Sequence, residues 1–293
     1  MLDIVNINKT FGSNKVLRDI NLTINKGEMV ALIGASGSGK STLMKHLSGL
    51  LVSDKGSGRI ALEGQTIQAQ GRLAKDARRT RSKIGIVFQQ FNLVGRLSVS
   101  TNVLLGALGR TPLWRSVFMA FSDEDQKLTR DALLKVGILE KLHQRASTLS
   151  GGQQQRAAIA RTLVQKASII VADEPIASLD PESSIMVMEL LKKLNQEEKL
   201  TVLVSLHQVD FALKYCPRAV ALSYGGIIYD GPSERLTVEK MKEIYGQASS
   251  TLFGSLHTTE NSHDAPLNPP KKSLVAQTEP IVRNNFNETY FRA

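Results

Sequence analysis

The sequence predicts an α/β fold built on a largely parallel sheet that is covered by helices. Short apolar stretches with the length of buried strands alternate with stretches of helical periodicity, which is the pattern of repeated strand and helix units. The strand-like stretches lie at residues 29–33, 84–88, 169–172 and 202–206. A glycine-rich segment at 34–41 joins the first of these strands directly to a helix that opens into Thr42.

The N-terminal stretch predicts a second, antiparallel sheet. Leu2, Ile4 and Ile7, and later Leu22 and Ile24, are spaced as in half-buried strands with turns between them. We therefore expect an antiparallel β edge subdomain before the glycine-rich segment.

The middle of the chain predicts a helical insertion. Strand signals fade between about residues 90 and 165, and helical patterns at 125–136 and 153–164 replace them. Further along, Asp180 and Pro181 provide an N-cap and a first-turn proline for a helix that runs towards Asn195. We expect an inserted α-helical subdomain over about 90–165.

Length and composition indicate one large domain with an attached lobe. The chain has 293 residues, of which 42% are hydrophobic and 22% charged. We expect the domain to cover 1–246 and a polar, flexible extension rich in Ser, Thr, Asn and Pro to cover 247–293. No run approaches the roughly 20 apolar residues that cross a bilayer, and the N-terminus lacks a basic and then apolar signal, so we expect a cytosolic protein.

Charge and cysteine content narrow the class of protein. The single cysteine, Cys216, excludes an internal disulfide framework and an all-cysteine metal site, and predicts a small core residue. The net charge of +10 suggests anionic neighbours such as nucleotides, nucleic acid or a membrane surface, but on its own it is better explained by a solvated basic surface. No zinc-finger spacing or aromatic RNP pattern supports nucleic-acid recognition.

The glycine-rich segment predicts a phosphate site. Its sequence, GASGSGKS, matches GxxxxGK[ST] and lies between a strand and a helix, as the motif requires. Backbone N–H groups of such a loop surround phosphate oxygens, the lysine reaches the outer phosphates and the serine hydroxyl binds Mg²⁺. The predicted nucleotide-binding residues here are Gly34, Ala35, Ser36, Gly37, Ser38, Gly39, Lys40, Ser41 and Thr42, with Ser41 also a metal ligand.

A buried strand at 168–174 ends in two carboxylates, at the sheet edge where open α/β folds bind ligands. Asp173 suits Mg²⁺, directly or through water. Glu174 suits the base that polarises the water attacking the terminal phosphate. An apolar strand that ends in Asp-Glu also occurs where a strand simply meets solvent, but the phosphate loop upstream favours the catalytic interpretation.

The segment LSGGQ at 149–153 begins an amphipathic helix, where Ser150 and the N–H groups of Gly151 and Gly152 predict a second phosphate-binding nest. With this motif the sequence resembles the ATP-binding cassette (ABC) family, whose signature is LSGGQ, from about residue 2 to residue 231. The resemblance implies a P-loop NTPase core that binds ATP and Mg²⁺, with Gln153 completing the signature.

The resemblance also implies roles for four other residues. Gln89 matches the glutamine loop that senses the metal and water, and His207 matches the histidine that holds the terminal phosphate and attacking water. Asp180 lies in the loop that crosses to the other subunit, and Phe11 takes the place of the aromatic residue that stacks on adenine. Taken alone, His207 fits a structural histidine and Phe11 fits a core residue.

In this family two subunits pair head to tail, so that the phosphate loop of one and the Ser150 nest of the other enclose each ATP. The resemblance therefore implies that a second copy of the chain is a partner and that a monomer is incompetent. ATP closes such a dimer, and hydrolysis with product release opens it.

Within the family the chain resembles stand-alone ATPase subunits of bacterial importers, since it has a single cassette, no long heptad insertion and no fused membrane span. The resemblance implies integral membrane permease subunits and a periplasmic or lipid-anchored substrate-binding protein as partners, no nucleic acid, and a peripheral position on the cytoplasmic face of the inner membrane. The alternative is a non-transport ABC ATPase that acts on nucleic acid. Co-purification with a permease would distinguish an importer subunit from that alternative.

The stretch at 109–121 lengthens the helical lobe and looks like that of the phosphonate-import ATPase subfamily. Its aromatic residues Trp114, Phe118 and Phe121 are spaced as a helical core of the lobe. The resemblance implies uptake of a small oxyanion, and phosphonate, phosphate and phosphite all stay open because the substrate does not touch this subunit.

Overall fold

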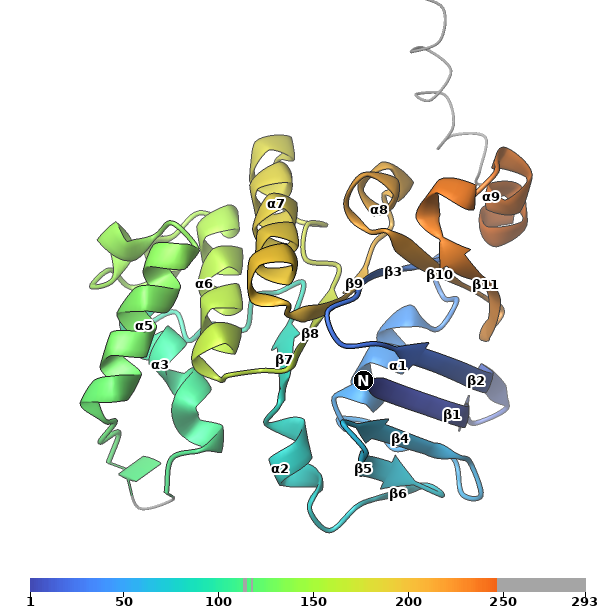
Figure 1. The fold of residues 1–293 in the computed structure, drawn as a ribbon, viewed down its shortest axis with the longest axis horizontal. Helices are drawn as coiled ribbons and strands as arrows, with labels where there is room; N and C mark the ends of the chain where they lie inside the picture. Colours follow the sequence, from blue (N-terminus) through green and yellow to red (C-terminus); the bar gives the residue numbers. More distant parts are fainter. Residues whose placement is uncertain (113–114, 117, 247–293) are drawn as a thin grey trace, which may run out of the picture. The chain divides into compact units, whose positions relative to one another are not determined.

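The computed structural model describes residues 1–112, 115–116 and 118–246 (Figure 1). The polar extension expected at 247–293 lies outside the described residues, as does Trp114. No helix in the described part of the chain has the length and apolar character needed to span a membrane.

A six-stranded sheet forms the centre of the fold and carries the predicted parallel strands. Its order is β11-β10-β3-β9-β8-β7, and all neighbouring pairs are parallel except β10 and β11. Both β3 and β9 are buried along their whole length, which explains their continuous apolar sequences. The strands are β3 (Met29–Ile33), β7 (Ile84–Val87), β8 (Ile169–Asp173), β9 (Thr201–Ser205), β10 (Arg218–Ser223) and β11 (Gly226–Pro232).

The predicted antiparallel edge sheet is present and is larger than the sequence indicated. It has five strands in the order β2-β1-β4-β5-β6, all paired antiparallel. Its apolar side chains form one core cluster with those of the six-stranded sheet and of α1 (Lys40–Leu47), which lies between the two sheets (Figure 1). The strands are β1 (Leu2–Phe11), β2 (Asn14–Ile24), β4 (Arg59–Leu62), β5 (Gln65–Ala69) and β6 (Arg72–Leu73).

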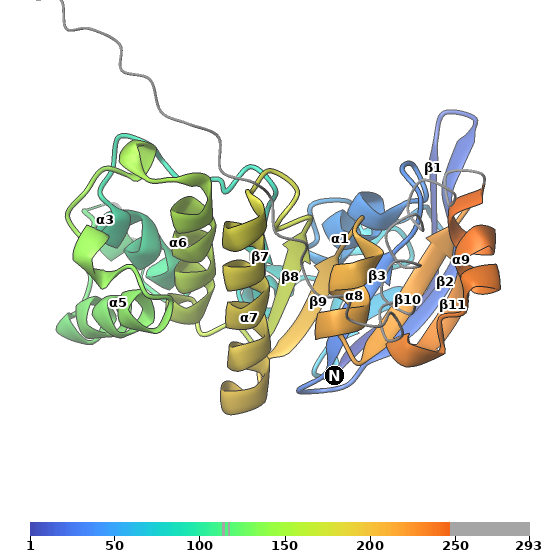
Figure 2. The same ribbon diagram turned by 90° about the horizontal axis from the view of Figure 1, so that it is seen from above.

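The helical insertion lies between β7 and β8 in the chain and packs as a separate group of helices (Figures 1 and 2). Two of its helices begin two residues earlier than the apolar pattern predicted, because Ser122 and Ser150 cap them with side-chain hydrogen bonds. Its described elements are α3 (Val99–Leu104), η1 (Leu105–Gly109), α5 (Asp123–Lys135), η2 (Leu139–Lys141), η3 (Ala146–Thr148) and α6 (Gly151–Val164).

The aromatic core predicted for this lobe is wrong at Phe118. That side chain is 78% exposed, and Phe121 is only half-buried. Helical spacing predicted burial, but residues 118–119 form a turn and 120 no regular structure, so no helix directs these rings into the lobe.

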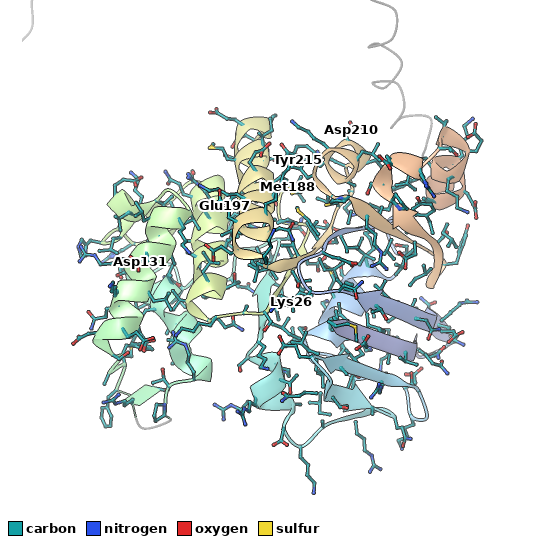
Figure 3. The ribbon with its side chains drawn as sticks, in the orientation of Figure 1. Lys26, Asp131, Met188, Glu197, Asp210 and Tyr215 are labelled. Carbon is teal, nitrogen blue, oxygen red and sulfur yellow. The ribbon has the colours of Figure 1, made fainter. Side chains whose placement is uncertain are left out.

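Of the remaining helices, α2 contacts β5 of the edge sheet, and α7, α8 and α9 cover the six-stranded sheet. Figure 1 shows α7, α8 and α9 on the side opposite α1. Met188 of α7 and Tyr215 of α8, both labelled in Figure 3, are buried where these helices pack on the sheet and on each other. Cys216 follows α8 and is buried as predicted. These elements are α2 (Ala77–Arg81), α7 (Pro181–Glu198), α8 (Val209–Tyr215), η4 (Ser233–Arg235) and α9 (Val238–Tyr245).

Candidate functional site

The glycine-rich loop turns sharply between β3 and α1, and its glycines are required for steric reasons. Gly34 and Gly39 have φ angles of 143° and 106°, which side-chain-bearing residues rarely adopt. A Cβ atom on Gly34 would lie 2.2 Å from the Leu222 carbonyl oxygen of β10. The backbone of the loop therefore packs directly against β10. The loop leads into the N-terminus of α1, where backbone N–H groups can bind an anion.

Lys40 is held inside this loop. Its Nζ donates hydrogen bonds to the carbonyl oxygens of Gly34, at 2.7 Å, and Ala35, at 3.1 Å. Burial lowers the pKa of the Lys40 ammonium, and the carboxylates of Glu174 and Asp173 act in the opposite direction. These carbonyl contacts keep the cation beside the loop, where it would meet an anionic group.

Asp173 ends β8 beside the first turn of α1. Its Oδ1 accepts hydrogen bonds from Ser41 Oγ at 3.2 Å and from Ser205 Oγ at 2.8 Å. Ser205 also accepts a hydrogen bond from the Glu174 N–H at 2.8 Å, so it links both carboxylate residues. The sequence analysis missed Ser205, although its place at the end of the strand before His207 was a usable signal.

Glu174 and His207 form a direct pair. His207 Nε2 lies 2.6 Å from Glu174 Oε1, so the shared proton is on Nε2 when Glu174 is ionised. Glu174 has a φ of 50°, an uncommon value for a residue with a side chain. A strained backbone of this kind persists only where the surrounding structure fixes it. The Glu174 side chain lines the same cavity as the phosphate loop.

These groups surround a cavity of about 320 Å³. Its lining brings together residues from the edge sheet, the phosphate loop and the ends of β8 and β9. Asn14 and Val16, which the sequence analysis did not identify, contribute the edge-sheet side. The lining residues are Asn14, Val16, Ser36, Gly37, Ser38, Gly39, Lys40, Ser41, Thr42, Glu174 and His207.

Phe11 and Gln89 are among the predicted residues that lie outside this lining. Phe11 is 47% exposed at the end of β1, with Lys9 Nζ 5.3 Å from the centre of its ring, so it is not a core residue. Gln89 is exposed just after β7. Both side chains are accessible, and neither lines the cavity of this single chain.

The LSGGQ residues form the N-terminus of α6, also outside the cavity lining. Ser150 Oγ accepts a hydrogen bond from the Gln153 N–H, and Gln153 Oε1 accepts one from the Ser150 N–H, which is a capping box. Ser150 is exposed, Gly151 is half-buried and Gly152 is buried. A Cβ atom on Gly152 would lie 2.6 Å from Ser183 Oγ, so α6 and α7 approach closely here.

Asp180 caps the adjacent helix, α7. Its side chain accepts a hydrogen bond from the Ser183 N–H at 2.9 Å, and hydrogen bonding with Ser183 lowers the pKa of the Asp180 carboxyl. The two helix starts are thereby adjacent through Ser183, which contacts both.

The oxygen donors near the loop fit a Mg²⁺ ion that nucleotide phosphates also ligate. Ser41 offers a hydroxyl and Asp173 a carboxylate, which are hard ligands of the kind Mg²⁺ prefers. No group of three or more His, Cys, Asp and Glu side chains among the described residues forms a metal site. Mg²⁺ typically keeps few protein ligands and several from phosphate and water, so the residues present fit this ion.

A comparison with protein families shows to which family the chain belongs. The profile described as ABC transporter matches residues 17–177, which include the phosphate loop, the LSGGQ segment and both carboxylates. The chain belongs to the ABC transporter family. As an ABC ATP-binding subunit it binds ATP and couples ATP hydrolysis to transport.

Curated ABC relatives match most of the chain. It is 56% identical over 253 residues to "Phosphonates import ATP-binding protein PhnC 1" of Cupriavidus metallidurans, covering 86% of this chain and 89% of that one. A "Phosphonates import ATP-binding protein PhnC" of Burkholderia pseudomallei is 59% identical over 248 residues, covering 84% and 81%. The protein of the same name from Escherichia coli K12 is 56% identical, covering 81% and 91%.

Solved ABC structures share the fold. A dimeric ATP-binding cassette in a post-hydrolysis state, bound to ADP and Pi, superposes with a TM-score of 0.67 at 33% identity, covering 80% of this chain and 99% of that one. The cbiO1 subunit of the cbiONQ ABC transporter complex of Clostridium perfringens gives 0.69 at 28% identity, covering 86% and 98%. The predicted P-loop NTPase fold of the ABC type is thus confirmed.

Proposed function

We propose that this chain is the ATP-hydrolysing subunit of a phosphonate importer. The observation that carries the proposal is its 54–59% identity, over more than four fifths of its length, to relatives named for phosphonate import. ATP hydrolysis itself belongs to the ABC family, and the phosphate loop and paired carboxylates provide residues suited to it.

In the proposed reaction Glu174 acts as general base for the attacking water, and the 2.6 Å contact with His207 orients its carboxylate. The water oxygen bonds to the terminal phosphorus as the bond to the bridging oxygen breaks and ADP leaves with the electron pair. Lys40 leaves its carbonyl partners to pair with the outer phosphates.

Ser41 and Asp173 would hold Mg²⁺, which when bound neutralises charge on the phosphate oxygens. Gln89, exposed after β7, would approach the metal and water, and Phe11 would stack on the adenine. Gln89 and Phe11 would therefore position the metal, the water and the nucleotide, and neither is the base.

We further propose that the protein works as a head-to-tail dimer on the cytoplasmic face of the inner membrane. The N-terminus of α6, with the exposed Ser150 and with Gly151 and Gly152, would complete the ATP site of the partner subunit. Asp180 would lie at the same interface. The assembly would include permease subunits and a substrate-binding protein that delivers the phosphonate.

A growth assay tests which substrate the importer transports. It uses a host from which the corresponding ATPase gene has been deleted. The host carries the permease and binding protein, and a phosphonate is the sole phosphorus source. We expect the wild-type chain to restore growth and Glu174→Gln to fail. Glu189→Gln, which changes an exposed glutamate on α7, is the matched control and should restore growth.

Parallel cultures with phosphite or phosphate as the phosphorus source separate the other oxyanions. Rescue on phosphite or phosphate that depends on this chain, without rescue on any phosphonate, would assign the importer to that oxyanion and overturn the proposed substrate.

A further inference from the structure

The last described helix, α9, reaches the start of the phosphate loop. Its Met241, Ile244 and Tyr245 are buried, and the helix packs against β10. Tyr245 is 7% exposed. Its hydroxyl oxygen accepts a hydrogen bond from the Gly34 N–H at 3.3 Å, across 211 residues of sequence.

No strand neighbour takes this N–H group. The parallel ladder between β3 and β10 ends at Ile33, which pairs with Ala221, so Gly34 lies just beyond it. Gly34 is also wedged against β10, since a Cβ atom there would lie 2.2 Å from the Leu222 carbonyl oxygen. A buried N–H without a partner is destabilising, so the Tyr245 hydroxyl satisfies a group that the sheet leaves unpaired.

Gly34 also contacts Lys40, through its carbonyl group. The Gly34 carbonyl oxygen accepts a hydrogen bond from Lys40 Nζ at 2.7 Å. Gly34 therefore connects the C-terminal helix, through its N–H, to the loop cation, through its carbonyl. A shift of Gly34 moves the point from which Lys40 approaches a phosphate, and small displacements of a charged donor weaken a charge-assisted hydrogen bond.

The hydroxyl is suited to a fixed role. Burial raises the pKa of Tyr245 to about 12, so the group stays neutral at physiological pH and the hydrogen bond does not switch with pH. Tyr245 also lines a second cavity of about 300 Å³ that residues 35–38 of the loop share. Tyr245 thus lies beside several residues of the loop, and its neutral hydroxyl adds no charge there.

We propose that Tyr245 is a positioning residue of the nucleotide site, which fixes the first peptide of the phosphate loop and thereby the starting position of Lys40. It acts through Gly34 and touches neither the nucleotide nor the attacking water. The inference rests on ATP binding by this subunit and is independent of the transported substrate, so failure of the phosphonate assignment would leave it intact.

Tyr245→Phe in the full-length protein tests this role, because it removes one oxygen and keeps the ring that fills the core. We expect the dissociation constant for ATP, measured by titration with a fluorescent analogue and competition, to rise about 3- to 10-fold, the effect of one hydrogen bond. The ATPase KM should rise with it, and kcat at saturating ATP should stay within about twofold.

Two tyrosines serve as matched controls. Tyr229→Phe removes a hydroxyl that donates to the Pro232 carbonyl oxygen at 2.6 Å on β11, away from the loop. Tyr215→Phe removes a buried hydroxyl that has no hydrogen-bond partner among the described residues. Both should bind ATP as the wild type does, whatever they do to the melting temperature.

Amide hydrogen exchange provides a second measurement that does not depend on turnover. The Gly34 amide should exchange at least about tenfold faster in Tyr245→Phe and at the wild-type rate in Tyr229→Phe. A lower melting temperature with unchanged ATP affinity and unchanged Gly34 exchange would show a purely structural tyrosine and overturn the proposal. Equal weakening of ATP binding in Tyr229→Phe would also overturn it.

Discussion

At the scale of single residues, the site depends on contacts among groups that are far apart in sequence. Ser41 and Ser205 both donate to Asp173, and Glu174 meets His207 at 2.6 Å. The residues with a strong local motif were predictable, because a phosphate loop fixes its own backbone. Ser205 was not predictable in the same way, since its role follows from the pairing of β8 with β9, which places it opposite Asp173.

Lys40→Ala should weaken nucleotide binding and turnover together. The substitution removes the cation that would pair with the outer phosphates, and charge-assisted hydrogen bonds contribute roughly 1.5–3 kcal/mol, which is about 10- to 100-fold in affinity. Nucleotide titration of the purified chain measures the effect. Lys45→Ala, which changes an exposed lysine on the same helix, is the control and should bind normally. Unchanged ATP affinity in Lys40→Ala would contradict the role.

At the scale of elements, the central strands were predictable and the peripheral ones were not. Stretches such as β3 and β9 are buried throughout, so their sequences are apolar without interruption. The short strands β5 and β6 contain polar and exposed residues, and they are strands because β5 pairs with β4 and β6 pairs with β5. Helix starts were predicted late because the capping serines lie before the apolar pattern.

Gly152→Ala tests the close approach of α6 and α7. The added Cβ would lie 2.6 Å from Ser183 Oγ and 2.8 Å from Ser183 Cβ, so one helix must shift. Overpacking of this kind costs roughly 1–3 kcal/mol in the free energy of unfolding. Urea denaturation measures that cost, and Ser183→Gly in the same chain should recover most of it by removing the clashing side chain. Full stability in Gly152→Ala alone would mean that the helices have room at this position.

At the scale of the whole molecule, the cavity of one chain lacks the LSGGQ residues. The lining contains the phosphate loop, Glu174 and His207, and the exposed start of α6 lies outside it. A site divided in this way is consistent with two copies that each provide half. The extension expected at 247–293 stays a prediction, since it lies outside the described residues.

Ser150→Arg tests the division of the site between copies. The arginine leaves the phosphate loop of its own subunit unchanged but would project from the start of α6, where the nucleotide of the partner must dock. On a Glu174→Gln background, in which ATP persists, we expect ATP-dependent dimer formation on size exclusion to be lost, and nucleotide affinity of the monomer to stay within about twofold. Arg145→Ser, an exposed change nearby in the lobe, should still form the dimer. A dimer of normal yield in Ser150→Arg would show that this helix start does not face the other ATP.

The coupling of ATP hydrolysis to uptake is tested most directly in proteoliposomes that contain the permease and this subunit, with the binding protein added outside. Labelled phosphonate uptake and phosphate release are measured on the same vesicles. The account predicts that phosphonate-loaded binding protein stimulates hydrolysis, and that Glu174→Gln lowers both rates by about 10² to 10⁴, the range expected for loss of a general base. Near-normal uptake and hydrolysis in Glu174→Gln, or hydrolysis that phosphonate does not change, would contradict it.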